Sequence, residues 1–159
     1  MMKKALVISF FLVSFSLPSF AQTQEQGDAR FHGFGTYGLR WKEFGVGGGI
    51  EFFFVDHFAI MPSVTSYFPN VGNRTNFSAD FRYYISEGPS QLYFLIGYSQ
   101  NWENTQPGNP GIRRTNKGAN VGVGAYIRVV EWVGLSTEFR FQSTSPQEAG
   151  FRVGLAFPL

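Results

Sequence analysis

The stretch GANVGVGAYIR, residues 118–128, alternates strictly between two kinds of side chain. One set of alternate positions carries only Ala, Val and Ile, while the other carries Gly, Asn, Tyr and Arg. A period of two is typical of a β-strand with one apolar face. The second face is unusual, because a soluble sheet would present Lys, Glu, Thr and Gln to water there. The stretch therefore predicts a strand whose polar face meets something other than open solvent.

The same alternation recurs on both sides of this stretch. Period-two patterns bounded by turn-forming residues predict strands at about residues 31–40, 45–54, 58–68, 77–85, 92–99, 118–128, 133–141 and 150–157. The first of these is ambiguous, because Phe34 falls on the face assigned to His32, Thr36 and Arg40. Counting it gives eight strands, an even number, as closed bacterial barrels require.

Single charges are spread over the non-apolar faces of these strands. Seven of them are interpreted as a lumenal charge network: Glu51, Asp80, Arg82, Arg128, Glu138, Arg140 and Arg152. Acids and arginines occur together, as expected for paired charges in a narrow lumen, since a lone buried charge is costly. The strands are also long enough to cross a bilayer at a tilt. The sequence predicts an all-β fold, an eight-stranded antiparallel up-and-down transmembrane β-barrel.

The connections between the predicted strands alternate in length. Those after the second, fourth and sixth strands are tight, and those after the third, fifth and seventh are longer, with a polar loop at residues 102–117 the longest. Outer-membrane barrels have this asymmetry of short periplasmic turns and long external loops. The first connection, residues 41–43, is short and departs from it. Pro62 falls inside a strand, so we expect a bulge or a distorted register there.

Aromatic residues gather near the strand ends, where they would form the two interfacial girdles of a membrane barrel: Tyr37, Trp41, Phe68, Trp102, Trp132, Phe141 and Phe157. Inward glycines would leave room for Tyr, Phe and Arg side chains across the lumen. Eight strands enclose just enough space for side chains to fill. A wide diffusion pore is therefore not expected, whereas a thin, charge-gated water path is compatible with this size.

The N-terminus has the three parts of a secretory signal peptide. Two lysines are followed by an apolar run over residues 5–17, and a small-residue cleavage site ends at Ala21. The apolar run is short for a transmembrane helix, which needs about 20 residues. We expect residues 1–21 to be a cleaved signal peptide and residues 22–159 to be one outer-membrane barrel domain.

Charge and composition exclude several classes of protein. The chain has 13 Lys and Arg against 11 Asp and Glu, and removal of Lys3 and Lys4 with the signal makes the two numbers equal. A mature chain without net charge gives no argument for binding nucleic acid, which requires a basic patch. Cys is absent, so the chain has neither a disulfide framework nor a thiolate metal site.

The sequence offers little for catalysis. Neither His32 nor His57 lies in a serine-nucleophile pattern, and His57 falls in a turn beside Asp56. No cluster of His, Cys or carboxylate residues suits a metal, and no cofactor is expected. Two alternatives to a non-catalytic membrane barrel stay open. One is a lipid A-modifying barrel enzyme, and the other is a soluble secreted β-barrel that binds a small apolar ligand.

With these features the chain resembles the small OmpA/OmpX-type outer-membrane β-barrels of Gram-negative bacteria. The resemblance covers residues 31–157 and rests on strand number, loop asymmetry and the last strand, GFRVGLAF at residues 150–157. That strand is similar to the one such barrels present to their assembly machinery, although Pro158 and Leu159 follow its last aromatic residue. The resemblance implies a monomeric integral outer-membrane protein with a structural, adhesion or minor solute-path role and no catalytic activity.

Four cations fall in the predicted external loops: Arg74, Arg113, Arg114 and Lys117. Two interpretations stay open for them. They contact lipopolysaccharide phosphates or another external ligand through charge-assisted hydrogen bonds, or they are solvated loop residues.

Overall fold

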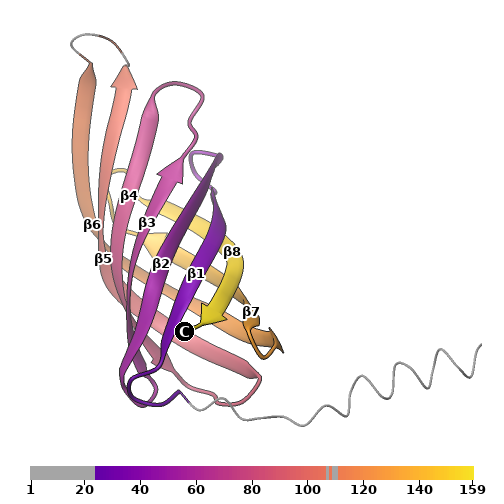
Figure 1. Cartoon of the computed structure of the whole chain (residues 1–159). Coiled ribbons are helices and arrows are strands. Elements are labelled where there is room, and N and C mark those ends of the chain that lie inside the picture. Colours follow the sequence, from indigo (N-terminus) through magenta and orange to yellow (C-terminus); the bar gives the residue numbers. More distant parts are fainter. Residues whose placement is uncertain (1–23, 107, 109–110) are drawn as a thin grey trace, which may run out of the picture.

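The computed structural model describes residues 24–106, 108 and 111–159, so the predicted signal peptide lies outside the described residues. Eight strands close into a barrel in chain order, each antiparallel to its neighbours (Figure 1). Their bounds are β1 (Ala29–Gly38), β2 (Glu43–Val55), β3 (Phe58–Tyr67), β4 (Asn73–Tyr84), β5 (Ser90–Gln106), β6 (Ile112–Val130), β7 (Val133–Gln142) and β8 (Glu148–Pro158). The predicted fold class is confirmed. The described residues contain no helix long and apolar enough to cross a membrane.

The pairing of β1 with β8 closes the barrel. It runs from Arg30 opposite Pro158 to Gly38 opposite Gly150. Closure lets the backbone N–H and C=O groups of the wall form hydrogen bonds with one another. Lipid offers these groups no hydrogen-bonding partners. The two faces of the wall differ in polarity as predicted, because exposed apolar side chains alternate with buried polar ones along the strands.

Packing resolves the ambiguity of the first strand. Phe34 points into the lumen, where the guanidinium carbon of Arg152 lies 3.8 Å from the centroid of its ring. An inward ring is favourable there because its face attracts a cation. β1 ends at Gly38, so Arg40, predicted to point inward, lies exposed in the β1–β2 turn instead.

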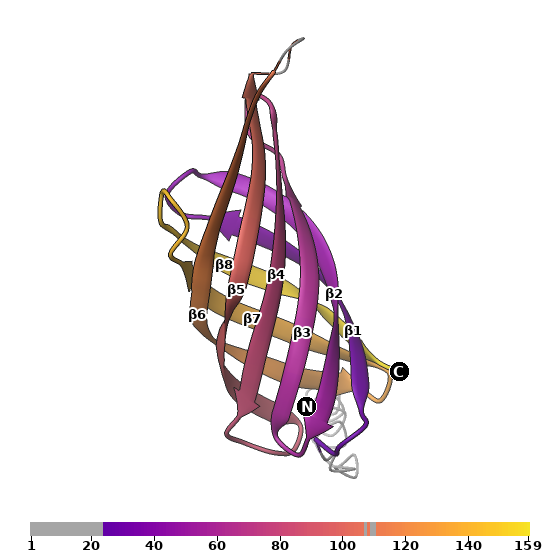
Figure 2. The same cartoon turned by 90° about the vertical axis from the view of Figure 1, so that its left-hand side faces the viewer.

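The hairpin of β5 and β6 projects beyond the rest of the barrel (Figures 1 and 2). β5 runs to Gln106 and β6 begins at Ile112, so most of residues 102–117 is paired strand. The expectation of a long loop is wrong. A hairpin that extends beyond the apolar part of the wall can carry polar residues on both faces, because its ladder is formed by backbone hydrogen bonds. β6 pairs with β7 only from Asn120 onward, so the projecting part of β6 pairs with β5 alone.

The connections differ less in length between the two ends of the barrel than the sequence predicts. The turns at residues 56–57 and 131–132 are tight. The β4–β5 connection, residues 85–89, is as long as the β3–β4 connection, residues 68–72. The asymmetry of this barrel therefore lies mainly in the lengths of β5 and β6.

Pro62 does not shift the strand register. β3 pairs with β4 without a break, and Pro62 lies opposite Ala79. On its other side, the pairing of β3 with β2 stops at Ser63 and resumes in the same register at Ile60. The irregularity between these two strands lies at residues 53–55 instead. The pairing with β2 is thus interrupted near the proline, which lacks an N–H donor, and the expected bulge does not form there.

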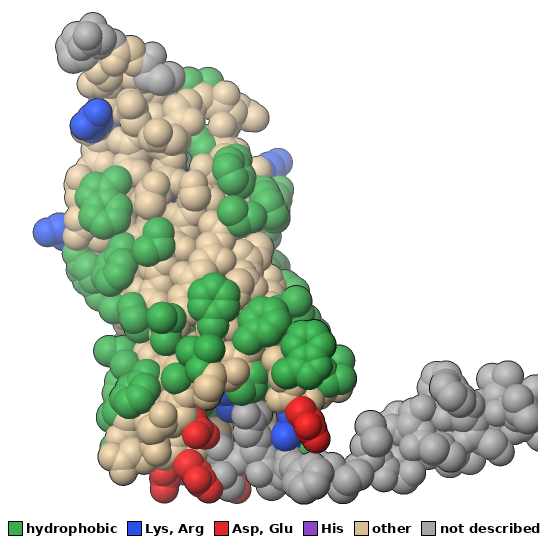
Figure 3. All heavy atoms as spheres, viewed as in Figure 1, with side chains coloured by type: hydrophobic (Ala, Val, Ile, Leu, Met, Phe, Trp, Pro, Cys, Tyr) green, Lys and Arg blue, Asp and Glu red, His purple; other side chains and the backbone are tan. Residues whose placement is uncertain are grey.

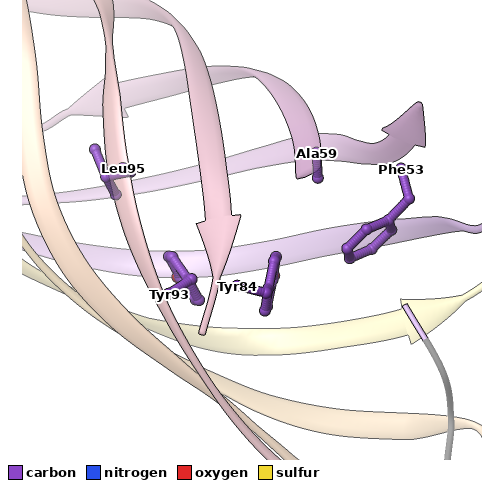
Figure 4. Close-up of a cluster of buried hydrophobic side chains, with 5 residues drawn as sticks. All are labelled: Phe53, Ala59, Tyr84, Tyr93 and Leu95. Atoms are coloured by element: carbon purple, nitrogen blue, oxygen red, sulfur yellow. The ribbon is translucent and has the colours of Figure 1, made fainter. Parts of the chain in front are cut away.

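A mainly aromatic cluster fills the lumen near the end that carries the β2–β3 turn. It consists of Phe53, Ala59, Tyr84, Tyr93 and Leu95 (Figure 4). The ring centroid of Tyr84 lies 5.2 Å from that of Phe53 and 5.0 Å from that of Tyr93. Gly124 on β6 makes room for this packing, because a Cβ there would overlap the ring of Tyr93. Inward glycine therefore has the spatial role that the sequence suggests.

Candidate functional site

Glu51 on β2 is the first centre of the lumenal charge network. Its carboxylate accepts hydrogen bonds from Arg82 Nη1 at 3.0 Å and from Tyr84 Oη at 2.6 Å. The Nε2 atom of His32 lies 3.1 Å from the same carboxylate, and Nη1 of Arg30 lies 3.7 Å from it. A fully buried carboxylate is stable only with partners of this kind.

Glu138 on β7 is the second centre, and Arg82 joins it to the first. Its carboxylate accepts hydrogen bonds from Arg82 Nη2 at 2.7 Å and Arg140 Nε at 2.6 Å. Tyr93 Oη donates to it at 3.0 Å. Arg140 also donates through Nη2 to Asp80 at 2.6 Å. Since Arg82 binds both glutamates, these charges form one connected network across the lumen.

Six of the seven residues predicted for the lumen lie in this network: Glu51, Asp80, Arg82, Glu138, Arg140 and Arg152. The seventh is Arg128. It shares their inward phase on β6 but lies half-buried near the end of the strand, where its backbone N–H donates to the carbonyl of Pro89. The sequence pattern gives the phase of a strand residue, but the distance of that residue from the middle of the barrel depends on the register.

Arg30 is a buried member of the network that lies outside the predicted strands. Its Nη2 donates to Gln91 Oε1 at 2.9 Å, and its guanidinium carbon lies 4.2 Å from the ring centroid of Tyr126. The sequence does contain the signal, because Arg30 lies two residues before His32 and so has the same phase. A strand predicted to begin at residue 31 leaves it out.

The network around Glu51 and Glu138 contains more arginines than carboxylates. Around the two centres, Arg30, Arg82, Arg140 and Arg152 face Glu51, Asp80 and Glu138, and the described residues add one more buried arginine, Arg74, and one more buried acid, Glu148. Arg152 is the least compensated arginine of the network, because its Nη1 lies 3.9 Å from Glu138 and its Nε has no hydrogen-bond partner in the structure. Together with the aromatic cluster, these side chains fill a cross-section that eight strands make narrow.

Exposed apolar side chains cover the outer wall (Figure 3). They occur on every strand, for example Phe52 on β2, Ile96 on β5 and Val153 on β8. A soluble monomer rarely exposes an apolar patch of more than a few hundred Å². All seven predicted girdle residues are exposed or half-exposed: Tyr37, Trp41, Phe68, Trp102, Trp132, Phe141 and Phe157. Trp41 lies beyond the strands, in the β1–β2 turn, and lines a pocket at the barrel mouth.

The four predicted loop cations do not lie together. Arg113 and Lys117 share the outward phase of Val121 on β6, and Arg113 lines a pocket of about 310 Å³ with Trp102. Arg114 has the opposite phase and lies opposite Glu103, and it lines the same pocket. Arg74 is 6% exposed. Its expected place in an external loop is wrong, because β4 begins one residue earlier and turns the side chain inward.

The two histidines lie in different surroundings. His32 belongs to the lumenal network, whereas His57 lies in the β2–β3 turn. His57 Nδ1 is 3.0 Å from Gln24 Oε1, and its Nε2 is 3.1 Å from Glu87 Oε1. These contacts tie the start of the described chain to two turns. Within the described ranges, no group of three His, Cys, Asp or Glu residues is placed to hold a metal ion.

No known protein family and no curated protein matches the chain by sequence. The N-terminal β-barrel domain of Pseudomonas aeruginosa OprF matches it in structure with a TM-score of 0.74 at 20% identity, over 87% of this chain and 100% of that chain. Neisserial surface protein A (NspA) matches with a TM-score of 0.62 at 14% identity, over 82% and 94%. The chain has the fold of the small OmpA/OmpX-type transmembrane barrels. The resemblance seen in the sequence is confirmed for the fold.

A third structure with this OmpA/OmpX-type fold is Ail, the attachment invasion locus protein of Yersinia pestis, in complex with the heparin analogue sucrose octasulfate. It matches with a TM-score of 0.59 at 12% identity, over 84% of this chain and 99% of that chain. In the present barrel, two separate surfaces carry charge. One is the closed lumen, whose arginines and acids bind one another, and the other is the projecting hairpin, whose cations are exposed.

Proposed function

We propose that the chain is an integral outer-membrane protein, exported by a signal peptide cleaved near Ala21, whose barrel anchors a non-catalytic binding hairpin at the cell surface. The exposed apolar wall and the fold shared with OprF, NspA and Ail support a place in the membrane. The monomeric barrel is assembled through β8, its terminal strand. The filled lumen supports an anchor in preference to a diffusion pore.

The observation that carries the proposal is the outward row of β6. This row passes without interruption from lipid-facing residues to cations: Val123, Val121, Ala119, Lys117, Thr115 and Arg113. Six residues separate Val123 from Lys117, about 20 Å along a strand, or about 15 Å along the membrane normal at the usual tilt. Half of the apolar band of a membrane barrel is about 12 Å. If Val123 lies near the midplane, Lys117 lies at the height of the lipid headgroups.

At that height the outer leaflet presents the phosphates of lipopolysaccharide. Lys117 and Arg113 supply cations for them, and Trp102 on the neighbouring strand supplies a ring suited to an interface. We therefore assign lipopolysaccharide as the partner of the hairpin's outward face. The complex of Ail with sucrose octasulfate offers a parallel, since it joins a barrel of this fold to a polyanion.

The test compares two arginines that are neighbours in sequence but have opposite phase. Arg113→Ala is expected to weaken binding of purified lipopolysaccharide to the folded, detergent-solubilised barrel about fivefold, and the double variant with Lys117→Ala about 25-fold, at about 1 kcal/mol per cation. Arg114→Ala removes the same charge from the other face and is the control. Equal losses for Arg113→Ala and Arg114→Ala would mean that net charge, and not this face, determines binding.

A further inference from the structure

A pocket of about 400 Å³ opens at the mouth of the barrel, on the side of the projecting hairpin. The β1–β2 turn, the β3–β4 connection and β5 meet there. Its lining includes Trp41, Glu43, Asn70, Arg74, Glu103 and Thr105. It borders the pocket beside Arg113, with which it shares Asn73, Glu103 and Asn104. Its other charged residues, Glu43 and Arg74, belong to the inward side of their strands.

A glycine holds the wall of this pocket in place. Gly72 has φ +80°, and a Cβ at this position would collide with the backbone carbonyl of Asn104. The β3–β4 connection therefore lies directly against β5, with no side chain between the two backbones. Only glycine can adopt this left-handed backbone conformation and also approach another backbone so closely. One wall of the pocket is thus set by a backbone contact.

An ion pair between buried Arg74 and half-buried Glu43 lines the pocket. Arg74 Nη2 lies 2.9 Å from Glu43 Oε2, and the guanidinium carbon of Arg74 lies 4.1 Å from the ring centroid of Tyr67. The Nε of Arg74 is buried and has no hydrogen-bond partner in the structure. Buried donors are nearly always paired, so the hydrogen-bonding capacity of the Arg74 guanidinium is incompletely used by the protein.

The charges of the lining disfavour an anion. Glu43 and Glu103 together outnumber Arg74, so a phosphate or sulfate would meet two carboxylates. The polar groups instead comprise donors and acceptors side by side, with Asn70 and Thr105 able to serve as both. Adjacent hydroxyl groups, each of which donates and accepts, are the complement of such a lining.

Trp41 supplies an apolar surface beside these polar groups. Its side chain is 45% exposed although it lines the pocket, so one part of the ring is free to be covered. The C–H face of a pyranose ring packs on an aromatic ring while its hydroxyls reach neighbouring polar groups. We propose that the mouth pocket binds an uncharged pyranose sugar, stacked on Trp41 and hydrogen-bonded by Arg74, Glu43 and Glu103.

The test uses the mature chain folded in phospholipid nanodiscs and titrated with methyl glucoside and methyl galactoside. We expect saturable changes in the amide NMR shifts of Asn70, Arg74 and Glu103 with at least one of them, and weaker binding of glucose 6-phosphate. Trp41→Ala should weaken binding about tenfold, and Trp41→Phe should keep it within about threefold, because a ring remains. Trp132→Ala, at the opposite end of the barrel, is the matched control and should bind as the unmodified chain does.

Faster migration of unboiled samples in SDS gels shows that each variant is a folded barrel. The proposal is overturned if neither glycoside gives saturable shifts, if glucose 6-phosphate binds more tightly than both, or if Trp41→Ala and Trp132→Ala bind equally. Nanodiscs that contain lipopolysaccharide separate two sources of sugar. Loss of glycoside binding there identifies the glycolipid of the same membrane as the occupant, and unchanged binding identifies an external glycan. Neither result depends on the cations of the outward face.

Discussion

The lumen of the barrel and the hairpin that projects from it contain the same types of charged residue in opposite circumstances. Arg82 and Glu138 in the lumen are nearly inaccessible and bind several partners each. Arg113 and Arg114 on the hairpin are exposed. Removing one partner of a buried pair leaves a charge that water cannot reach, whereas an exposed pair contributes little because water replaces it. The same residue type is therefore structural in one region and available to a ligand in the other.

The largest expected effect separates two glutamates. Glu138→Gln leaves Arg82, Arg140 and Arg152 with one carboxylate fewer in the lumen, and should lower the free energy of unfolding by about 3–5 kcal/mol. Glu103→Gln on the hairpin should change it by less than about 1 kcal/mol. Urea unfolding of the barrel in lipid vesicles, followed by tryptophan fluorescence, measures both. Similar losses in the two variants would contradict the distinction between the regions.

A second pair of variants places the same arginine at two heights on one face of β6. Val123→Arg puts a charge in the middle of the apolar row and should cost about 2–4 kcal/mol. Thr115→Arg lies eight residues further along the same row, between Lys117 and Arg113 and so outside the apolar band, and should leave insertion unchanged. The yield of folded barrel after insertion into vesicles gives the comparison. If Thr115→Arg impaired insertion as much, the boundary of the apolar layer would have to lie further along the hairpin.

The smallest expected effect comes from shortening the hairpin itself. Replacing residues 105–112 by Asn-Gly joins Asn104 to Arg113, which already lie opposite each other, through a two-residue turn. The free energy of unfolding should change by no more than about 0.5 kcal/mol, because no lumenal contact is lost. The same urea experiment tests this. A large loss of stability would instead show that the projecting part supports the barrel.

The sequence by itself determined the strands, the polarity of the two faces and the closed eight-stranded architecture. Lipid and lumen impose opposite chemistry on alternate residues, and that alternation can be read from local sequence alone. The inward phase of Glu51, Arg82 and Glu138 follows in the same way. The sequence also contains the phase of Arg30, although the predicted strand boundary excluded it.

Only the tertiary structure decided which of these residues meet. The contact of Arg82 with both Glu51 and Glu138 joins three strands, and it depends on the strand register. The side-chain pattern repeats every two residues, so it does not fix that register. The extension of β5 and β6 into polar sequence depends on the partner strand and not on composition. One wall of the mouth pocket depends on the close approach of Gly72 to Asn104, a contact between two distant segments that no local pattern encodes.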